Sequence, residues 1–230
     1  MNIITATKTR EDNLKSNMFN IEANKNYNQT DKYDRIIYAV YELSKSSHIQ
    51  SKLNKLKQYD EYTFKHCINV ALKATLLGVE LGYKGTDLKS LATGALIHDI
   101  GKQKVPLEIL NKKGKLTPVE MEIIRKHPSE GYNIIKKDTH ISKRAKEIVY
   151  QHHEDYNGTG YPRGLHGNEI DELAMIVHIC DAYDALVTKR SYKDAFPKSK
   201  AISIINEGNQ LMYNPRIVCA FNQHMMCNNN

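Results

Sequence analysis

The sequence predicts an all-α protein, folded as a compact bundle of many helices. Three observations predict it. Apolar residues recur at helical spacing along most of the chain. Residues suited to capping helices precede several of these stretches. No stretch shows the apolar–polar alternation of a half-buried strand.

Apolar periodicity begins at Tyr33, after about 30 residues that are rich in Asn, Thr and Lys and are expected to be disordered or loosely attached. The expected helices are 33–59 as one helix or two, 62–81, 88–98, 118–127, 129–137, 143–153, 172–187, 199–207 and a short helix from 215. Residues 155–168 hold four glycines and a proline, so a loop is expected there.

Several helix ends can be assigned to single residues. Thr117 is expected to cap a helix, with Glu120 completing a capping box. Thr86 or Asp87 is expected to cap the helix that ends at His98, and Ser142 a later one. Gly82 is a helix stop and Gly94 allows close helix packing, while Pro128 is expected to end or kink a helix just after His127.

Composition restricts the class of protein. The chain has 230 residues, a net charge of +7 and a pI near 9.0. No apolar run approaches the roughly 18 to 20 residues that cross a bilayer, and no secretion signal opens the chain, so we expect no membrane span and a cytoplasmic protein. The lysines are scattered without an aromatic–basic repeat, which predicts no DNA partner. Four cysteines lack the spacing of a zinc knuckle or a disulfide framework: Cys67, Cys180, Cys219 and Cys227.

Histidines gather where the expected helices end. His98 and Asp99 follow an apolar run, His127 ends one helix, and His152 and His153 end another. Asp181 lies inside a later helix, and a bundle can bring such positions together. Imidazoles with carboxylates and no thiolates suit iron, manganese or zinc. Two ions held roughly 3.5 to 4 Å apart can hydrolyse a phosphoester.

Single histidines and doublets carry little information on their own. The remaining histidines, apart from His66, are interpreted as surface or ordinary helix residues: His48, His140, His166, His178 and His224. The informative feature is the order in which the doublets, His127 and Asp181 follow one another.

That order resembles the HD-GYP family, a branch of the HD-domain phosphohydrolases. The motifs that carry the resemblance are HDIGK at 98–102, HPSEG at 127–131, HHE at 152–154, NGTGYP at 157–162 and DAYDAL at 181–186, followed by Arg190 and Tyr192-Lys193. The resemblance covers about residues 62–221. It implies a bundle of the HD-domain type over 59–225, preceded by an N-terminal segment, 1–58, with a disordered start and then helices. That segment is a helical cap, a contact of a homodimer or a remnant.

The resemblance implies roles for individual residues. The implied metal ligands are His66, His98, Asp99, His127, His152, His153 and Asp181, with Asp99 as the bridge between two ions. Asp99 and Lys102 are the implied catalytic residues, and Lys102 lies near the substrate phosphate. Arg190 and Lys193 would hold phosphate oxygens. Tyr161 would pack near a guanine base or anchor its loop.

The position of Tyr62 predicts the number of metals. Some family members bind a third ion through a Glu one turn before the first His, and Tyr62 stands there. Glu61 is adjacent, but one residue of helix turns it about 100° away. We therefore expect two divalent ions, Fe or Mn, with Zn as an alternative that affinity alone does not exclude.

The expected function is that of a cyclic di-GMP phosphodiesterase. A hydroxide bridging the metals would attack phosphorus and give linear pGpG; whether cleavage continues to GMP stays open. Two alternatives remain. One is hydrolysis of another cyclic dinucleotide or nucleotide, and the other is a cyclic di-GMP sensor with little turnover.

Overall fold

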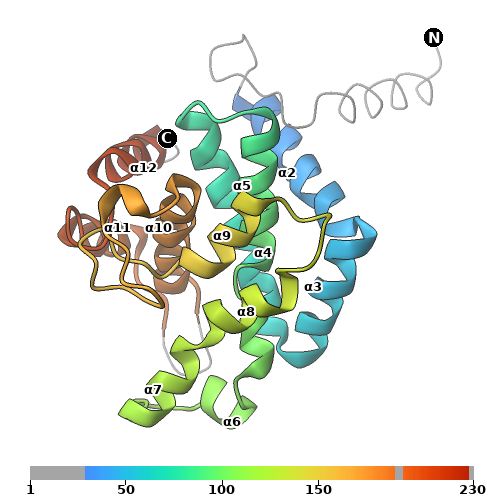
Figure 1. The fold of residues 1–230 in the computed structure, drawn as a ribbon. Helices are drawn as coiled ribbons and strands as arrows, with labels where there is room; N and C mark the ends of the chain where they lie inside the picture. Colours follow the sequence, from blue (N-terminus) through green and yellow to red (C-terminus); the bar gives the residue numbers. More distant parts are fainter. Residues whose placement is uncertain (1–28, 190–193, 228–230) are drawn as a thin grey trace.

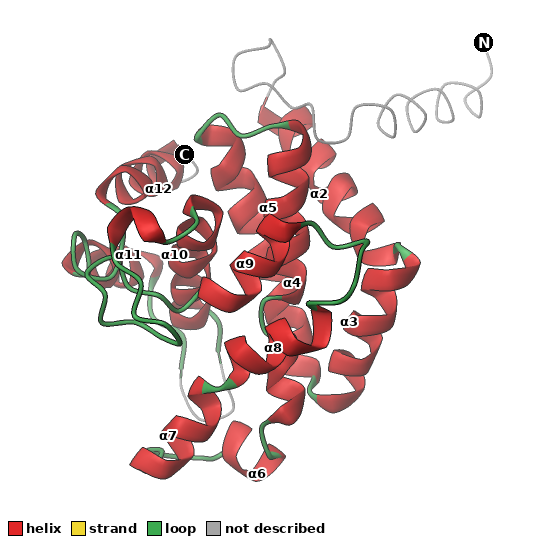
Figure 2. Cartoon of the chain, in the orientation of Figure 1, coloured by secondary structure: helices red, strands yellow, loops and turns green. Residues whose placement is uncertain are grey.

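The computed structural model describes residues 29–189 and 194–227. Within these ranges every regular element is a helix, and the only extended pairings are two isolated bridges (Figure 2). The elements are α2 Gln29–Lys45, α3 Ser47–Tyr59, α4 Glu61–Glu80, α5 Gly85–Ile97, η1 Ile100–Lys104, α6 Leu107–Leu110, α7 Pro118–Arg125, α8 His127–Ile135, α9 Lys143–Gln151, η2 Gly167–Glu169, α10 Glu172–Val187, α11 Lys198–Glu207 and α12 Pro215–Cys227. The all-α prediction is confirmed.

Most helices begin and end where local sequence chemistry predicts. Thr117 and Glu120 form the expected capping box of α7. The Ser142 side chain accepts a hydrogen bond from the Ala145 amide and caps α9. Gly82 follows α4 with a φ of 87°, a conformation that glycine adopts without steric cost.

Three local expectations are wrong. Helix α5 begins at Gly85 with Lys84 at the N-cap position, so neither Thr86 nor Asp87 caps it. Pro128 does not end a helix after His127. It lies in the first turn of α8, where an intrahelical N–H bond is not required, and His127 is the first residue of that helix. Helix α9 ends at Gln151, just before the two histidines that it was expected to reach.

Helices α4 and α5 lie in the middle of the bundle (Figure 1). Helix α4 packs against α2, α3, α5, α10 and α12, and α5 also packs against α9. Buried apolar side chains from the helices between α2 and α12, except α6 and α7, form one cluster. Helices α2 and α3 therefore share the hydrophobic core of the helices that follow them. Among the described residues, no helix has both the length and the apolar content needed to cross a bilayer.

Two glycines allow close approaches between helices. A Cβ on Gly94 would lie 2.6 Å from Ile148 Cδ1, so the predicted close packing at Gly94 is confirmed, against α9. A Cβ on Gly101 would lie 1.9 Å from the His127 carbonyl oxygen. The 3-10 helix η1 thus meets the start of α8 backbone to backbone, which places Asp99 beside His127.

Candidate metal centre

The seven predicted ligands come from six places in the fold. His66 lies in α4, His98 follows the last residue of α5, and Asp99 precedes η1. His127 opens α8, and Asp181 lies in α10. His152 and His153 follow α9. The structure brings all seven together in the interior: six are buried and His153 is half-buried.

Six of these residues form two groups that could each hold a metal ion. One group is His66, His98 and Asp99, which we call the acidic triad; the other is His127, His152 and His153, the imidazole triad. Within each triad the ligand atoms lie within 4.8 Å of one another.

Asp99 faces the histidines of the two triads with different oxygens. Its Oδ2 lies 3.4 Å from His98 Nε2 and 3.9 Å from His66 Nε2. Its Oδ1 lies 3.2 Å from His127 Nε2 and 3.8 Å from His152 Nε2. One carboxylate therefore has an oxygen directed at each set of imidazoles, the arrangement that a bridging ligand requires.

Asp181 also spans the two triads. Its Oδ1 lies 2.7 Å from His66 Nε2 and 3.9 Å from His98 Nε2. Its Oδ2 lies 4.0 Å from His153 Nε2. The two aspartates thus connect the same imidazoles from different elements, η1 and α10.

Three of the histidines are oriented in the same way by their own helices. The Nδ1–H group of each donates to the carbonyl oxygen three residues earlier: His98 to Ala95, His127 to Ile124 and His152 to Val149, at 2.8, 2.8 and 3.0 Å. A carbonyl can only accept, so in each neutral ring Nδ1 carries the proton and Nε2 presents its lone pair. This tautomer directs Nε2 at the centre and is the usual arrangement of metal-binding histidines.

The polar atoms at the centre fit a bound cation. His98 Nε2 and Asp99 Oδ1 are buried and have no hydrogen-bond partner among the described residues. His127 Nε2 and His152 Nε2 lie 3.1 Å apart although both rings already use Nδ1 as the donor. Two lone pairs facing each other at that distance are unfavourable unless a proton or a metal ion lies with them. The nitrogen and oxygen donors suit a divalent ion of the iron, manganese or zinc type.

The carboxylates control ionisation in the acidic triad. Burial alone would lower the pKa of His66, but hydrogen bonds with Asp181 and Asp184 raise it. Burial opposes protonation of His98 in the same way, and Asp99 raises its pKa well above the usual value. In return, although burial acts in the opposite direction, Lys102 and His98 hold the pKa of Asp99 well below its usual range.

Ionisation in the imidazole triad shifts the other way. Burial lowers the pKa of His127 and lowers those of His152 and His153 further. Each of these rings also lies close to another imidazole of the group, which disfavours a second positive charge. These three rings are therefore held neutral, the form that binds a metal.

The predicted substrate residues lie beside this centre where the structure describes them. Lys102 Nζ lies 2.5 Å from Asp99 Oδ2. The Tyr161 ring stacks on the His153 ring, with centroids 4.9 Å apart and the planes inclined by 24°. The Arg125 guanidinium lies 5.5 Å from the centroid of the Tyr161 ring. Arg190 and Lys193 fall outside the described residues.

Tyr161 belongs to a loop that folds tightly against the two histidines. Its amide donates to the His153 carbonyl oxygen at 2.9 Å. A Cβ on Gly160 would lie 2.1 Å from the Asp155 amide nitrogen, so only glycine fits there. Buried Glu154 accepts hydrogen bonds from the amides of Arg163 and Leu165. The glycines and Glu154 together set where the Tyr161 ring lies.

Sequence reasoning missed two residues that support His66. Asp184 Oδ2 lies 2.7 Å from His66 Nδ1, and Asp184 Oδ1 accepts from Lys73 at 2.8 Å. Asp184 stands three residues after Asp181, so the helical spacing places both carboxylates on the same side of α10. That spacing could have identified Asp184 from the sequence. No sequence pattern could have identified Lys73, because its partner lies 111 residues away.

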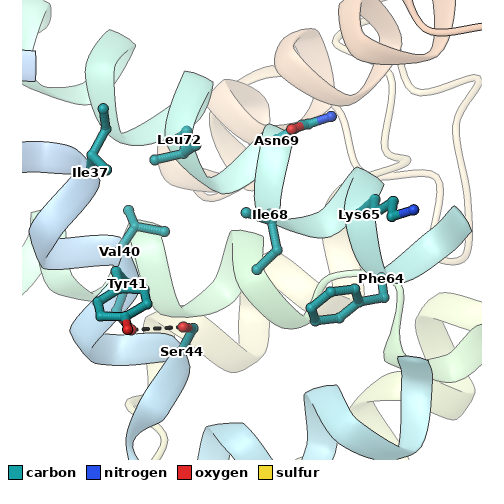
Figure 3. Close-up of a pocket in the computed structure, with 9 residues that line it drawn as sticks. All are labelled: Ile37, Val40, Tyr41, Ser44, Phe64, Lys65, Ile68, Asn69 and Leu72. Atoms are coloured by element: carbon teal, nitrogen blue, oxygen red, sulfur yellow. Dashed lines mark hydrogen bonds between the residues drawn. The ribbon is translucent and has the colours of Figure 1, made fainter. Parts of the chain in front are cut away.

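An apolar pocket elsewhere contains none of these groups. It measures about 430 Å³ and lies between α2 and α4, lined by Ile37, Val40, Tyr41, Ser44, Phe64, Lys65, Ile68, Asn69 and Leu72 (Figure 3). No imidazole or carboxylate lines it. His66, the proposed metal ligand of α4, does not line this pocket.

Comparisons with known proteins agree with this geometry. A family model described as HD domain matches residues 43–217. A cyclic di-GMP phosphodiesterase of Pseudomonas aeruginosa is 36% identical over 169 residues, covering 74% of this chain and 41% of that protein. A 3′3′-cGAMP-specific phosphodiesterase of Vibrio cholerae is 35% identical over 159 residues, covering 69% and 34%. The chain spans less than half the length of these two relatives.

A solved structure supports the fold alone. An HDG"Y"P protein from Bdellovibrio bacteriovorus matches with a TM-score of 0.64 and 24% identity, over 86% of this chain and 63% of that one. The family match covers well over half of the chain, and it includes all seven predicted ligands. The resemblance read from the HDIGK, HPSEG, HHE and GYP motifs is thereby confirmed, and the chain belongs to the HD-domain family.

Proposed function

We propose that this chain is a metal-dependent phosphodiesterase that hydrolyses cyclic di-GMP to linear pGpG. The observation that carries the proposal is Asp99, which directs one oxygen at the acidic triad and the other at the imidazole triad. The Pseudomonas relative, named a cyclic di-GMP phosphodiesterase, supports the choice of substrate.

The residues would hold two divalent ions. His66, His98 and Asp181 would bind one ion, His127, His152 and His153 the other, and Asp99 would bind both. Fe or Mn is the proposed metal, with Zn as the alternative. When bound, the ions would supply a polarised water and Lewis-acid stabilisation of phosphate charge. Hydrolysis adds water to phosphorus and breaks one P–O3′ bond, leaving a 3′-hydroxyl and a 5′-phosphate.

The chain's own cations and loops would hold the substrate. Lys102 lies against Asp99 and can neutralise charge that develops on the phosphate oxygens. Tyr161, beside His153, would contact a guanine base. Arg190 and Lys193, close in sequence to Asp181, are proposed phosphate contacts. Residues 59–225 would form the hydrolase, and residues 1–58 a preceding segment whose helices cover it.

The direct test is turnover by protein of verified metal content. Protein loaded with Fe(II) or Mn(II) is incubated with cyclic di-GMP without oxygen, and products are separated by chromatography. We expect pGpG, and the ratio of pGpG to GMP shows whether a second cleavage occurs. Asp99→Ala should abolish product, and Asp87→Ala, at a partly exposed aspartate paired with Arg144, should not. Absence of pGpG with metals present would overturn the proposal.

A second substrate is favoured by one comparison. The Vibrio relative is named for 3′3′-cGAMP, and its identity to this chain is close to that of the Pseudomonas relative. A panel of cyclic di-GMP, 3′3′-cGAMP and cyclic di-AMP at equal concentration ranks kcat/KM for each. Tight binding of cyclic di-GMP without turnover would instead support a sensor.

Elemental analysis tests the ligands separately from the reaction. The His98→Ala, Asp99→Ala double variant should lose metal relative to the unaltered protein. Unchanged metal content in that variant would show that the ligand assignment is wrong.

A further inference from the structure

His178 lies on the same helix as two residues of the metal centre. His178, Asp181 and Asp184 follow one another at three-residue spacing in α10, which keeps them on one side of the helix. His178 is 6% exposed. From the sequence it was interpreted as an ordinary helix residue, yet its ring faces the centre's loop.

The two nitrogens of His178 contact two points of that loop. Nδ1 lies 2.8 Å from the His152 carbonyl oxygen, and a carbonyl only accepts, so His178 donates there. Nε2 lies 3.2 Å from Asp155 Oδ1, in contact with it but without a hydrogen bond. The other oxygen of Asp155 accepts a hydrogen bond from the Thr159 hydroxyl. One side chain therefore bonds α10 to the histidine pair and also contacts the start of the glycine-rich loop.

Ring packing fixes the same side chain from a third direction. The His178 ring lies 5.1 Å from the Tyr213 ring and 6.3 Å, edge-on, from the His153 ring. The turn before Tyr213 is itself bound to the loop, because the Tyr156 amide donates to the Met212 carbonyl and the Asn157 amide to the Leu211 carbonyl. His178 stands where α10, the 152–161 segment and this turn meet.

These contacts bear on the relative placement of ligands from different elements. His152 and His153 follow α9, whereas Asp181 belongs to α10. Just after α9, the backbone of the pair is held to α10 by the hydrogen bond from His178 to the His152 carbonyl. Tyr161 depends on the same connection, since its amide binds the His153 carbonyl.

We propose that His178 is a positioning residue that holds the 152–161 segment in register with Asp181, and so sets the imidazole triad and Tyr161. The proposal rests on the proposed metal site and not on the identity of the nucleotide. Its alternative is that His178 only fills space in the core.

Two substitutions separate these alternatives. Asn places an amide NH₂ close to the position of Nδ1, so His178→Asn keeps a donor for the His152 carbonyl. His178→Leu introduces an apolar side chain of similar size and loses the donor, which leaves a buried carbonyl unsatisfied. Ile179→Ala, at a fully buried neighbour on α10 outside the site, controls for general loss of stability.

The test uses three measurements on the full chain, two of them without substrate. Amide hydrogen exchange over 153–161 is followed by mass spectrometry in the metal-free protein. Mn(II) affinity is measured against a competing chelator. His178→Leu should raise the exchange rate about tenfold and lower affinity at one of the two ions about 10- to 100-fold, the range for residues that support metal ligands.

The third measurement is turnover. His178→Leu should lower kcat more than it raises KM, and His178→Asn should restore exchange, affinity and kcat to within about threefold. Ile179→Ala should be less stable in urea but bind Mn(II) normally. Wild-type exchange and affinity in His178→Leu, or an Asn variant as impaired as the Leu variant, would overturn the proposal. If the wild-type protein hydrolyses none of the nucleotides, the proposed function fails, but the exchange and affinity results still decide the role of His178.

Discussion

The two triads are built from similar side chains but differ in charge and in what surrounds them. The two histidines of the acidic triad lie among Asp99, Asp181 and Asp184, and their pKa values are raised. The imidazole triad is oriented mainly by backbone carbonyls and a stacked tyrosine, and the pKa values of its histidines are lowered. The difference teaches that a metal ion would compete with protons more strongly at the acidic triad than at the imidazole triad.

The two triads also differ in how the chain assembles them. The acidic triad lies where α4 and α5 meet at the centre of the bundle, and α10 adds carboxylates. The imidazole triad depends on short helices, α8 and α9, and on a loop. Asp99 and Asp181 each face histidines of both triads, so changes at these two aspartates should affect both proposed ions, and changes elsewhere should affect mainly one.

The largest effect is expected at the shared residue. Asp99→Asn keeps the shape of the side chain but removes the charge that faces both triads. Loss of metal-assisted stabilisation of several kcal/mol lowers kcat/KM about a thousandfold. Steady-state kinetics with elemental analysis check this result. A variant that keeps both ions and loses less than tenfold in rate would show that Asp99 is not shared.

The next effect tests the backbone contact that joins the triads. Gly101→Ala would place a Cβ 1.9 Å from the His127 carbonyl oxygen, so α8 must move away from η1. We expect a loss of about 3 kcal/mol in the free energy of unfolding. Gly114→Ala is the matched control, because Gly114 has a φ of 113° but no atom within 4 Å of the added Cβ. That control should cost about 1 to 2 kcal/mol.

Urea unfolding of the metal-free proteins gives both values. Only Gly101→Ala should also lower kcat/KM and metal content, because it separates His127 from Asp99. Equal destabilisation by the two substitutions, with unchanged metal content in both, would mean that η1 and α8 do not hold the triads together.

Most of the helices could be predicted because they depend on local chemistry. The capping box at Thr117 and Glu120 needs only four consecutive residues. The error at His127 has a local cause as well: a proline can end one helix or begin the next, and the sequence does not distinguish these when the two helices are one residue apart. Gly101 shows what a local pattern omits. Only glycine fits there because the backbone of His127, 26 residues later in the sequence, packs against it.

The site residues also divide into those that the sequence identifies and those that only the fold identifies. The seven proposed ligands were predicted from the order of the histidines and aspartates and from the family that this order resembles. Asp184 and His178 were not, although their spacing from Asp181 places them on the same side of the helix. Their importance depends on partners, His66 and the His152 carbonyl, that only the tertiary fold brings near. The opposed ionisation of the two triads has the same origin, since it follows from which carboxylates lie near which ring.

A smaller effect is expected from the carboxylate behind His66. Asp184→Asn weakens the hydrogen bond that orients His66 and should lower metal affinity at the acidic triad about 10- to 100-fold. The imidazole triad should bind normally. Asp138→Asn is the matched control, because Asp138 is also paired with a lysine, Lys52, but lies away from the centre. Mn(II) titration against a chelator resolves the two ions; equal weakening of both would contradict separate sites.

The smallest effect is on the pH dependence of stability without metal, and it distinguishes the triads by sign. Histidines in the unfolded chain titrate near pH 6.5. The raised pKa values of His66 and His98 contribute stability that is fully present below that pH and is lost as pH rises toward their folded values. The lowered pKa values in the imidazole triad contribute stability that is present above about pH 6.5 and is lost as pH falls.

The free energy of unfolding of EDTA-treated protein should therefore pass through a maximum near pH 6.5, with each histidine contributing a slope of at most about 1.4 kcal/mol per pH unit. Urea unfolding between pH 5 and 8 measures it. His152→Gln should flatten the acid side, and His66→Gln the alkaline side. His140→Gln, at an exposed histidine, should change neither. A stability that rises or falls steadily across this range would show that the two triads do not ionise in opposite directions.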